Sequence, residues 1–376
     1  MLKCVQNAES EVCDNIDIKS CEWLLDSADA PIRHRVYREL LNDERTAKKI
    51  EPELLDNPAV RLWLKHLKPE TPPQHRRMTH GSFDFCLENA MLKCVQLGLH
   101  AGIPQFMDAI HFYIENFHTP PPLDISCKKD SEIADVPMIA AYLTLAEIDD
   151  HKLQSYMLNR LDAVYDFVRK GDYGIYMDGE EKAELKGLPS VYHDRPVIKK
   201  HIGGDDSVLP GIHDIVAMHR LYDLRDPAVN EKINAIIRYI STDEFHSTVA
   251  EGYGIGIYDN KTRYYAMGWD PKYPGWFDTA AYFETGFMPR LLFFLEYISL
   301  YPAARDTMWF HDVCHRLNQW GTDRGTHSFP KEWLKESQGY AVMGHHISFG
   351  ENRRKRNWAE IESTFYMQLL QAATEE

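Results

Sequence analysis

The segment GHHISFGENRRKRNWAEIESTF, residues 344–365, concentrates side chains that can transfer protons or bind anions. Two glycines bracket His345 in a tight loop, and Glu351 and Arg353 precede an apolar pattern of helical spacing. A histidine near a glutamate suits general acid or base catalysis, and an arginine can hold a carboxylate or phosphate. The alternative is that Glu351 and Arg353 form ion pairs that attach the last helix to the first repeat.

A second cluster combines two acids with a histidine. Asp205 and Asp206 follow a glycine pair at a predicted helix start, one to two turns before His213. Adjacent carboxylates at this place can bind a cation, or one of them can keep a raised pKa if both are buried. Capping of the following helix explains one of the two acids without any chemistry.

A third cluster places acids among aromatic residues. In YPGWFDTAAYFETGF, Asp278 and Glu284 lie close to Trp276 and Tyr282. Aromatic faces beside an acid suit a sugar ring or a carbocation as substrate. The two acids do not share one helical face, and a helix cap at Asp278 with the aromatic rings in the core is the alternative.

A possible metal-binding pattern occurs in HDVCH, residues 311–315. His311 and His315 share a helix face, and Cys314 lies close enough to join them. The same spacing fits an amphipathic helix whose Cys314 packs inward. Because no second cluster supports a metal site, we predict neither a metal ion nor another cofactor.

Helical periodicity dominates the elements that must position these residues. The proline-rich stretch KPETPPQHRR predicts that an N-terminal helical region, residues 1–80, ends there and that one domain spans residues 81–376. Four later segments repeat a helix–turn–helix plan. Their turns are predicted near residues 98–104, 149–150, 226–227 and 301–302. A small β-hairpin is predicted within residues 253–268.

Two of the second helices run into related glycine turns, GDYGIY (171–176) and EGYGIG (251–256). Helical hairpins with such turns resemble the α/α toroids of terpenoid cyclases and protein prenyltransferases, over residues 80–376. The C-terminal segment also resembles the ending of uncharacterised bacterial proteins with this predicted fold. The resemblance implies an all-α ring of about five to six helix pairs with the β-hairpin inserted.

The chain departs from both families in its motifs. The Asp-x-Asp-Asp proton donor of squalene-type cyclases is missing, and GGDDS offers only an adjacent pair. Of the zinc ligands of a protein prenyltransferase, only Asp312 and Cys314 match, with His345 or His346 as an unusually near third ligand. The catalytic residues of neither family can therefore be assigned to positions in this chain.

Composition restricts the partners. The 376 residues carry 42 basic and 57 acidic side chains, a net charge of −15, which disfavours nucleic acids and anionic membranes as partners. Seven scattered cysteines without a CxxC pair fit a reducing, cytoplasmic setting. No apolar stretch predicts a signal peptide or a membrane span. A small-molecule substrate is expected, and a homo-oligomer is compatible with the sequence.

The toroid resemblance favours an enzyme with a deep, aromatic-lined cavity that performs acid–base chemistry on a hydrophobic or polycyclic substrate. In that version a carboxylic acid protonates the substrate, aromatic faces stabilise positive charge, and a histidine collects the proton. A glycan hydrolase or lyase is the second hypothesis, because α/α toroids also act on sugars. A non-enzymatic binding scaffold is the third. A closed apolar chamber would favour the cyclase-like enzyme. An open polar cleft beside a tryptophan would favour the glycan hydrolase or lyase, and a ring whose centre is filled would favour the scaffold.

Overall fold

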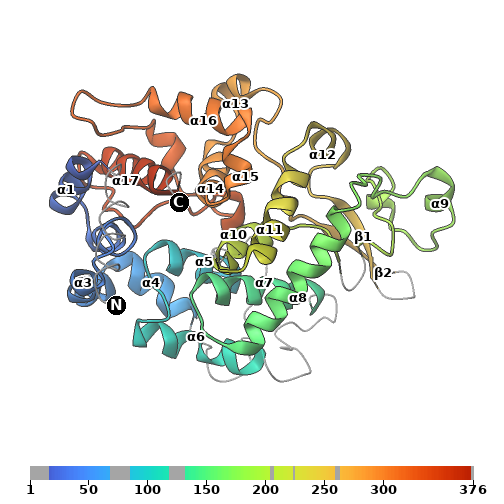
Figure 1. The fold of residues 1–376 in the computed structure, drawn as a ribbon, viewed down its shortest axis with the longest axis horizontal. Helices are drawn as coiled ribbons and strands as arrows, with labels where there is room; N and C mark the ends of the chain where they lie inside the picture. The colour runs from blue at the N-terminus through green and yellow to red at the C-terminus, as the bar shows by residue number, and fades with distance from the viewer. Residues whose placement is uncertain are drawn as a thin grey trace. The chain divides into compact units, whose positions relative to one another are not determined.

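The chain is predominantly helical, as its sequence predicts. The computed structural model describes residues 17–67, 85–117, 132–203, 207–222, 225–258 and 263–373. Within these ranges it contains α-helices α1 to α17 and one two-stranded sheet (Figure 1). The all-α class is therefore confirmed. The predicted domain boundary at residue 80 lies outside the described residues.

Backbone contacts divide the chain into two compact units. Unit 1 consists of Met1–Phe112 and Thr285–Glu376, and unit 2 consists of Tyr113–Glu284. Each unit has its own buried helices, and the closure of the helix pairs into a ring stays a prediction.

Unit 1 combines the N-terminal and C-terminal parts of the chain. Its helices, with α6 crossing into unit 2, are α1 (Ile18–Ser27), α2 (Ala30–Arg35), α3 (Glu44–Asp56), α4 (Pro58–Leu67), α5 (Leu87–Gln96), α6 (Pro104–Phe117), α14 (Met288–Ile298), α15 (Pro302–Arg305), α16 (Met308–Asn318) and α17 (Trp358–Ala373). Helix α17 packs against α1 and α14, and α4 packs against α5. Helices α5 and α14 are buried almost throughout, so the polar side chains that they carry must find partners inside unit 1.

Four of the helices of unit 2 pack against one another in pairs. Its helices, with α13 at the boundary, are α7 (Glu132–Leu145), α8 (His151–Val168), α9 (Gly179–Ala183), α10 (Ile212–Met218), α11 (Pro227–Ile240), α12 (Asp243–Thr248) and α13 (Thr279–Thr285). Helix α10 packs on α7, and α11 packs on α8 (Figure 1). Every residue of α10 is buried, whereas α8 and α11 each bury one face. The buried helices α7 and α10 are therefore neighbours, and so are the amphipathic helices α8 and α11.

The predicted turns between paired helices are confirmed in all four segments, the fourth of them between the end of α14 and the start of α15. Non-helical segments separate α5 from α6 and α7 from α8, and the helical structure is also interrupted between α10 and α11. Asp150 and Asp226 cap α8 and α11 by accepting bonds from backbone N–H groups of the first turn. In the fourth segment both predicted helices are split, the first into α13 and α14 and the second into α15 and α16. Non-helical backbone at Phe287 (φ −82°, ψ 87°) and a proline in the first turn of α14 explain the break between α13 and α14.

The predicted β-hairpin is also confirmed. Strand β1 (Gly254–Tyr258) pairs antiparallel with β2 (Arg263–Met267). Ile255 and Ile257 of β1 form a small apolar cluster with Val197. The hairpin is thus an attachment on unit 2 and not the start of a sheet domain.

The described helices include none with the length and apolar character that a membrane crossing requires.

Unit 2 depends on one buried ion pair. Arg160 of α8 contacts the Asp214 carboxylate at 2.7 Å and donates to the Leu209 carbonyl at 2.7 Å and to the Ser207 carbonyl. The side chains of Arg160 and Asp214 are 14% and 7% exposed. Because a buried arginine without its carboxylate is strongly unfavourable, Asp214→Asn is expected to lower the free energy of unfolding by about 3–5 kcal/mol in urea titrations.

The matched control is Asp162→Asn, which breaks the more exposed pair with Lys232 at 2.5 Å. This change is expected to cost no more than about 1 kcal/mol. Equal effects of the two substitutions would show that the Arg160–Asp214 pair does not support unit 2.

Candidate functional site

Unit 1 contains an open pocket of about 530 Å³. It is lined by Lys331, Glu332, Lys335, Glu336, Arg353 and Trp358. The first four residues come from the short 3₁₀ helix η5 (Lys331–Leu334) and the chain after it, and Trp358 begins α17. The Arg353 guanidinium stacks on the Trp358 ring, 3.8 Å from its centre. Five of the six lining residues are charged.

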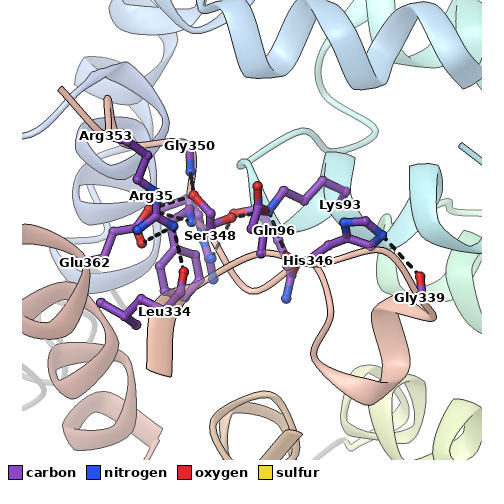
Figure 2. Close-up of polar contacts among 12 residues, drawn as sticks. Arg35, Lys93, Gln96, Leu334, Gly339, His346, Ser348, Gly350, Arg353 and Glu362 are labelled. Atoms are coloured by element: carbon purple, nitrogen blue, oxygen red, sulfur yellow. Dashed lines mark hydrogen bonds and ion pairs between the residues drawn. The ribbon is translucent and has the colours of Figure 1, made fainter. Parts of the chain in front are cut away.

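A buried lysine holds the pocket carboxylate Glu336. Lys93 of α5 is 1% exposed, and its ammonium lies 2.6 Å from a Glu336 carboxylate oxygen. The same ammonium donates to the His346 carbonyl at 2.8 Å and to the Ser348 carbonyl (Figure 2). All three hydrogens of the ammonium therefore have acceptors, which is what burial of this charge requires.

The ion pair determines the charge of Glu336. Burial by itself raises the pKa of Glu336, but attraction to Lys93 and the hydrogen bond from it outweigh this effect. The pKa of Glu336 consequently lies below its usual value, so the carboxylate is ionised at neutral pH. Its side chain is 41% exposed, and ligands in the pocket can reach it.

A second carboxylate, Glu362 of α17, lies beneath Arg353 and is fully buried. One of its oxygens accepts from the Ser348 hydroxyl at 2.7 Å and from the Phe349 N–H at 3.1 Å. Its other oxygen lies 2.9 Å from Arg353 (Figure 2). Burial raises the pKa of Glu362 to about 7, although Arg353 and Ser348 oppose the rise. Glu336 and Glu362 are therefore in opposite electrostatic environments.

A second buried cation, Arg35 of α2, stabilises the inner part of the same unit. It donates to the Gln96 carbonyl at 3.0 Å and to Glu39 at 2.8 Å, and it lies 3.6 Å from Glu296. Burial raises the pKa of Glu296 to about 6 even though Arg35 lowers it. The Arg35 guanidinium also lies 5.4 Å from the centre of the Phe349 ring, which extends the contact to the chain after Ser348.

Glycine allows the segment between Glu336 and α17 to approach its neighbours. Gly344 has φ +81°, and a Cβ atom there would lie 2.2 Å from the Pro289 carbonyl oxygen. At Gly339, whose φ is +155°, a Cβ atom would lie 2.4 Å from the His345 ring. Side chains at these positions would push the segment away from α14 and from its own return.

The sequence-predicted residues of the last segment have different surroundings. Arg353 lines the pocket. His345 accepts or donates at 2.8 Å with the Ser337 hydroxyl, and burial lowers its pKa. Glu351 is buried; it accepts from the Asp29 N–H at 2.8 Å and lies 2.6 Å from Lys355. Because Lys355 also contacts the Asp29 carboxylate at 2.8 Å, these charges attach the chain before α17 to the start of α2.

Unit 2 holds the predicted aromatic cluster. Trp276 stacks on His246 with 4.4 Å between ring centres, and its indole N–H donates to Asp243 at 2.7 Å. The exposed Asp278 accepts from the Ala281 N–H at 2.9 Å and so caps α13. Tyr282, half-buried, packs over Gly275.

The other predicted residues of unit 2 are placed separately. Glu284 is exposed near the end of α13. His213 is buried between Tyr142 and Trp269, whose ring centres lie 5.6 and 5.7 Å away. Asp205 and Asp206 lie outside the described residues.

The candidate metal ligands on α16, where no metal was predicted, do not form a cluster. His311 and His315 are exposed, and burial raises the pKa of the Cys314 thiol to about 12. A thiol with this pKa keeps its proton at neutral pH, whereas metals bind the thiolate. The only group of three closely spaced metal-ligating side chains among the described residues is a different one, described below.

Sequence patterns do not single out Lys93, Glu336 or Glu362. The sequence does contain one indication for Lys93 and Glu362, a charged residue among apolar neighbours. Lys93 lies in the otherwise apolar stretch AMLKCV, and Glu362 lies in a predicted helix whose neighbours are apolar at helical spacing. A charge inside a helix that is buried on all sides indicates a specific partner, but the partner itself cannot be read from the local pattern.

Comparison with known protein families, with curated proteins and with solved structures gave no match. The pocket and the charges beneath it are therefore the basis for assigning a function.

The raised pKa of Glu362 predicts a pH-dependent stability. Because the folded-state pKa of about 7 exceeds the ordinary value of 4.5, the folded chain keeps a proton that the unfolded chain has lost. The contribution of Glu362 is fully present below pH 4.5 and is lost as the pH rises through 7. Relative to Glu362→Gln, the wild type is expected to lose up to roughly 3 kcal/mol of unfolding free energy across this range.

Urea unfolding of both proteins at several pH values between 4 and about 8 measures this difference. Parallel pH profiles of wild type and Glu362→Gln would contradict the assignment of a raised pKa to this group.

Proposed function

We propose that the pocket of unit 1 binds a glycan with acidic substituents and cleaves it as a hydrolase or lyase. The observation that supports this most is an open pocket in which an ionised glutamate faces an arginine–tryptophan stack. Its volume of about 530 Å³ falls within the range usual for small-molecule sites, about 300–1,000 Å³. Sugar rings need both hydrogen-bonding groups and an apolar surface, and this lining offers the two together.

The charge balance of the lining favours an acidic substrate. Glu336 is neutralised by Lys93, whereas Glu362, whose pKa burial raises to about 7, offsets the charge of Arg353 only in part at neutral pH. Lys331, Lys335 and Glu332 make no ion pair within the described part of the chain. At least one positive charge is thus left over in a pocket of a protein whose net charge is −15. A carboxylate or sulfate on the sugar would meet this excess.

Glu336 is the proposed catalytic base. The low pKa imposed by Lys93 keeps it ionised, so it can take a proton from an attacking water in a hydrolase or from the carbon beside an acidic group in a lyase. Glu332 is the second carboxylate of the lining and would serve as the proton donor to the leaving oxygen. Trp358 and Arg353 would position the ring.

Cyclisation of a hydrophobic substrate fits this pocket less well. Carbocation chemistry needs a chamber that excludes water and presents apolar walls. The unit 1 pocket is open to solvent, and five of its six lining residues carry charged groups. For this pocket we therefore prefer the glycan hypothesis over the cyclase hypothesis.

The function is tested by incubating the protein with neutral and acidic oligosaccharides and detecting products by mass spectrometry. A hydrolase adds one water to the products, and a lyase leaves an unsaturated product of unchanged total mass. Turnover is expected only with acidic substrates. Glu336→Gln is expected to lower kcat by about 10²- to 10⁴-fold while substrate still binds.

Glu180→Gln is the matched control, because it removes one exposed glutamate from α9, which belongs to unit 2. It should leave kcat unchanged. Binding of acidic glycans without any product would favour the scaffold hypothesis, and equal turnover by Glu336→Gln and wild type would refute the role of Glu336.

A further inference from the structure

A cluster of metal-ligating side chains lies in unit 1 outside the pocket. His34 comes from α2, Glu51 from α3, and His100 from the turn between α5 and α6. One ligand atom from each residue lies within 4.8 Å of the other two. The rings of His34 and His100 are stacked, with 5.9 Å between their centres and 25° between their planes. Three segments far apart in the sequence thus bring two imidazoles and one carboxylate together.

His34 supplies an independent observation. Its side chain is 1% exposed, and neither ring nitrogen has a hydrogen-bond partner. Buried polar atoms are almost always bonded, so an imidazole with two orphaned nitrogens requires an explanation. Burial, with a smaller effect from His100, lowers the pKa of His34 to about 4. The ring is consequently neutral at neutral pH and has a lone pair to offer.

We propose that His34, Glu51 and His100 bind a divalent transition-metal ion such as Zn²⁺. Two imidazoles and a carboxylate are a donor set that zinc accepts, with one further position for water. An ion coordinated by His34 gives the buried ring the partner that the protein atoms do not. The site also connects α2, α3 and the turn after α5, and α2 and α3 already pack against each other.

Small side-chain movements would complete the geometry. Metal–ligand bonds of about 2.0–2.1 Å at a tetrahedral centre place the ligand atoms about 3.3 Å apart. Glu51 and His100 are half-buried, so surrounding atoms enclose their side chains less tightly than that of His34. His100 Nδ1 accepts from the Gly102 N–H at 3.1 Å in an exposed contact, and binding through this nitrogen would exchange that bond for the metal.

The test is metal titration of the full chain after treatment with a chelator. Zn²⁺ is added and its stoichiometry and affinity are measured by calorimetry and elemental analysis, while Co²⁺ absorption reports the donor atoms. Wild type is expected to bind an ion that raises its melting temperature. His100→Ala and Glu51→Gln are each expected to weaken binding by about tenfold or more and to change the Co²⁺ spectrum. These half-buried residues are chosen because replacement of the buried His34 can unfold the unit.

His311→Ala/His315→Ala is the matched control, since it removes two exposed histidines of α16 from the same unit. It should bind Zn²⁺ as wild type does. The proposal is overturned if wild type binds no ion, if His100→Ala and Glu51→Gln retain wild-type affinity, or if the α16 variant is the one that loses binding.

Discussion

The structure of unit 1 depends on the burial of one ammonium group. Lys93 lies on a helix that is buried almost throughout, so its charge cannot be hydrated and must be met by protein oxygens. Glu336 and the carbonyls of His346 and Ser348 supply them. These acceptors all belong to residues 336–348. The hydrogen bonds that the Lys93 ammonium donates to them therefore hold this segment against α5. The Ser348 hydroxyl can then donate to Glu362. Ser348 thus connects the buried carboxyl group of α17 to the buried ammonium group of α5.

The two carboxylates of this network differ because their surroundings differ. Glu336 is partly exposed and contacts Lys93 directly, so its pKa is low. Glu362 is fully buried, and desolvation outweighs the attraction of Arg353, so its pKa is high. Enzymes that act on sugars commonly need one ionised and one protonated carboxyl group. In unit 1 the ionised Glu336 lines the pocket beside Glu332, the proposed proton donor, whereas Glu362 lies beneath the arginine of the lining and holds it in place.

Local signals were readable from the sequence, and long-range pairings were not. The turns at residues 149–150 and 226–227 and the hairpin around residues 254–267 depend on neighbours a few positions away, and their prediction was correct. Lys93 pairs with Glu336 across 243 positions, which no local pattern contains. For Glu351 the sequence left two interpretations open, catalysis beside a histidine or an ion pair that attaches the last helix, and its contacts with Asp29 and Lys355 are of the second kind. His34 and His100 meet only because α2 and the α5–α6 turn do.

Hydrogen–deuterium exchange of Lys93→Met tests the organising role of Lys93 most directly. Methionine keeps the length and apolar stem of the side chain but removes the charge, so the acceptors in residues 336–348 lose their donor. The account predicts faster exchange at amides of this segment, including the Ser337 N–H that bonds to the His345 carbonyl, while α17 stays protected. Lys152→Met, at an exposed position of α8 in unit 2, should leave exchange in unit 1 unchanged. Unaltered exchange in residues 336–348, or an equal rise throughout unit 1, would contradict it.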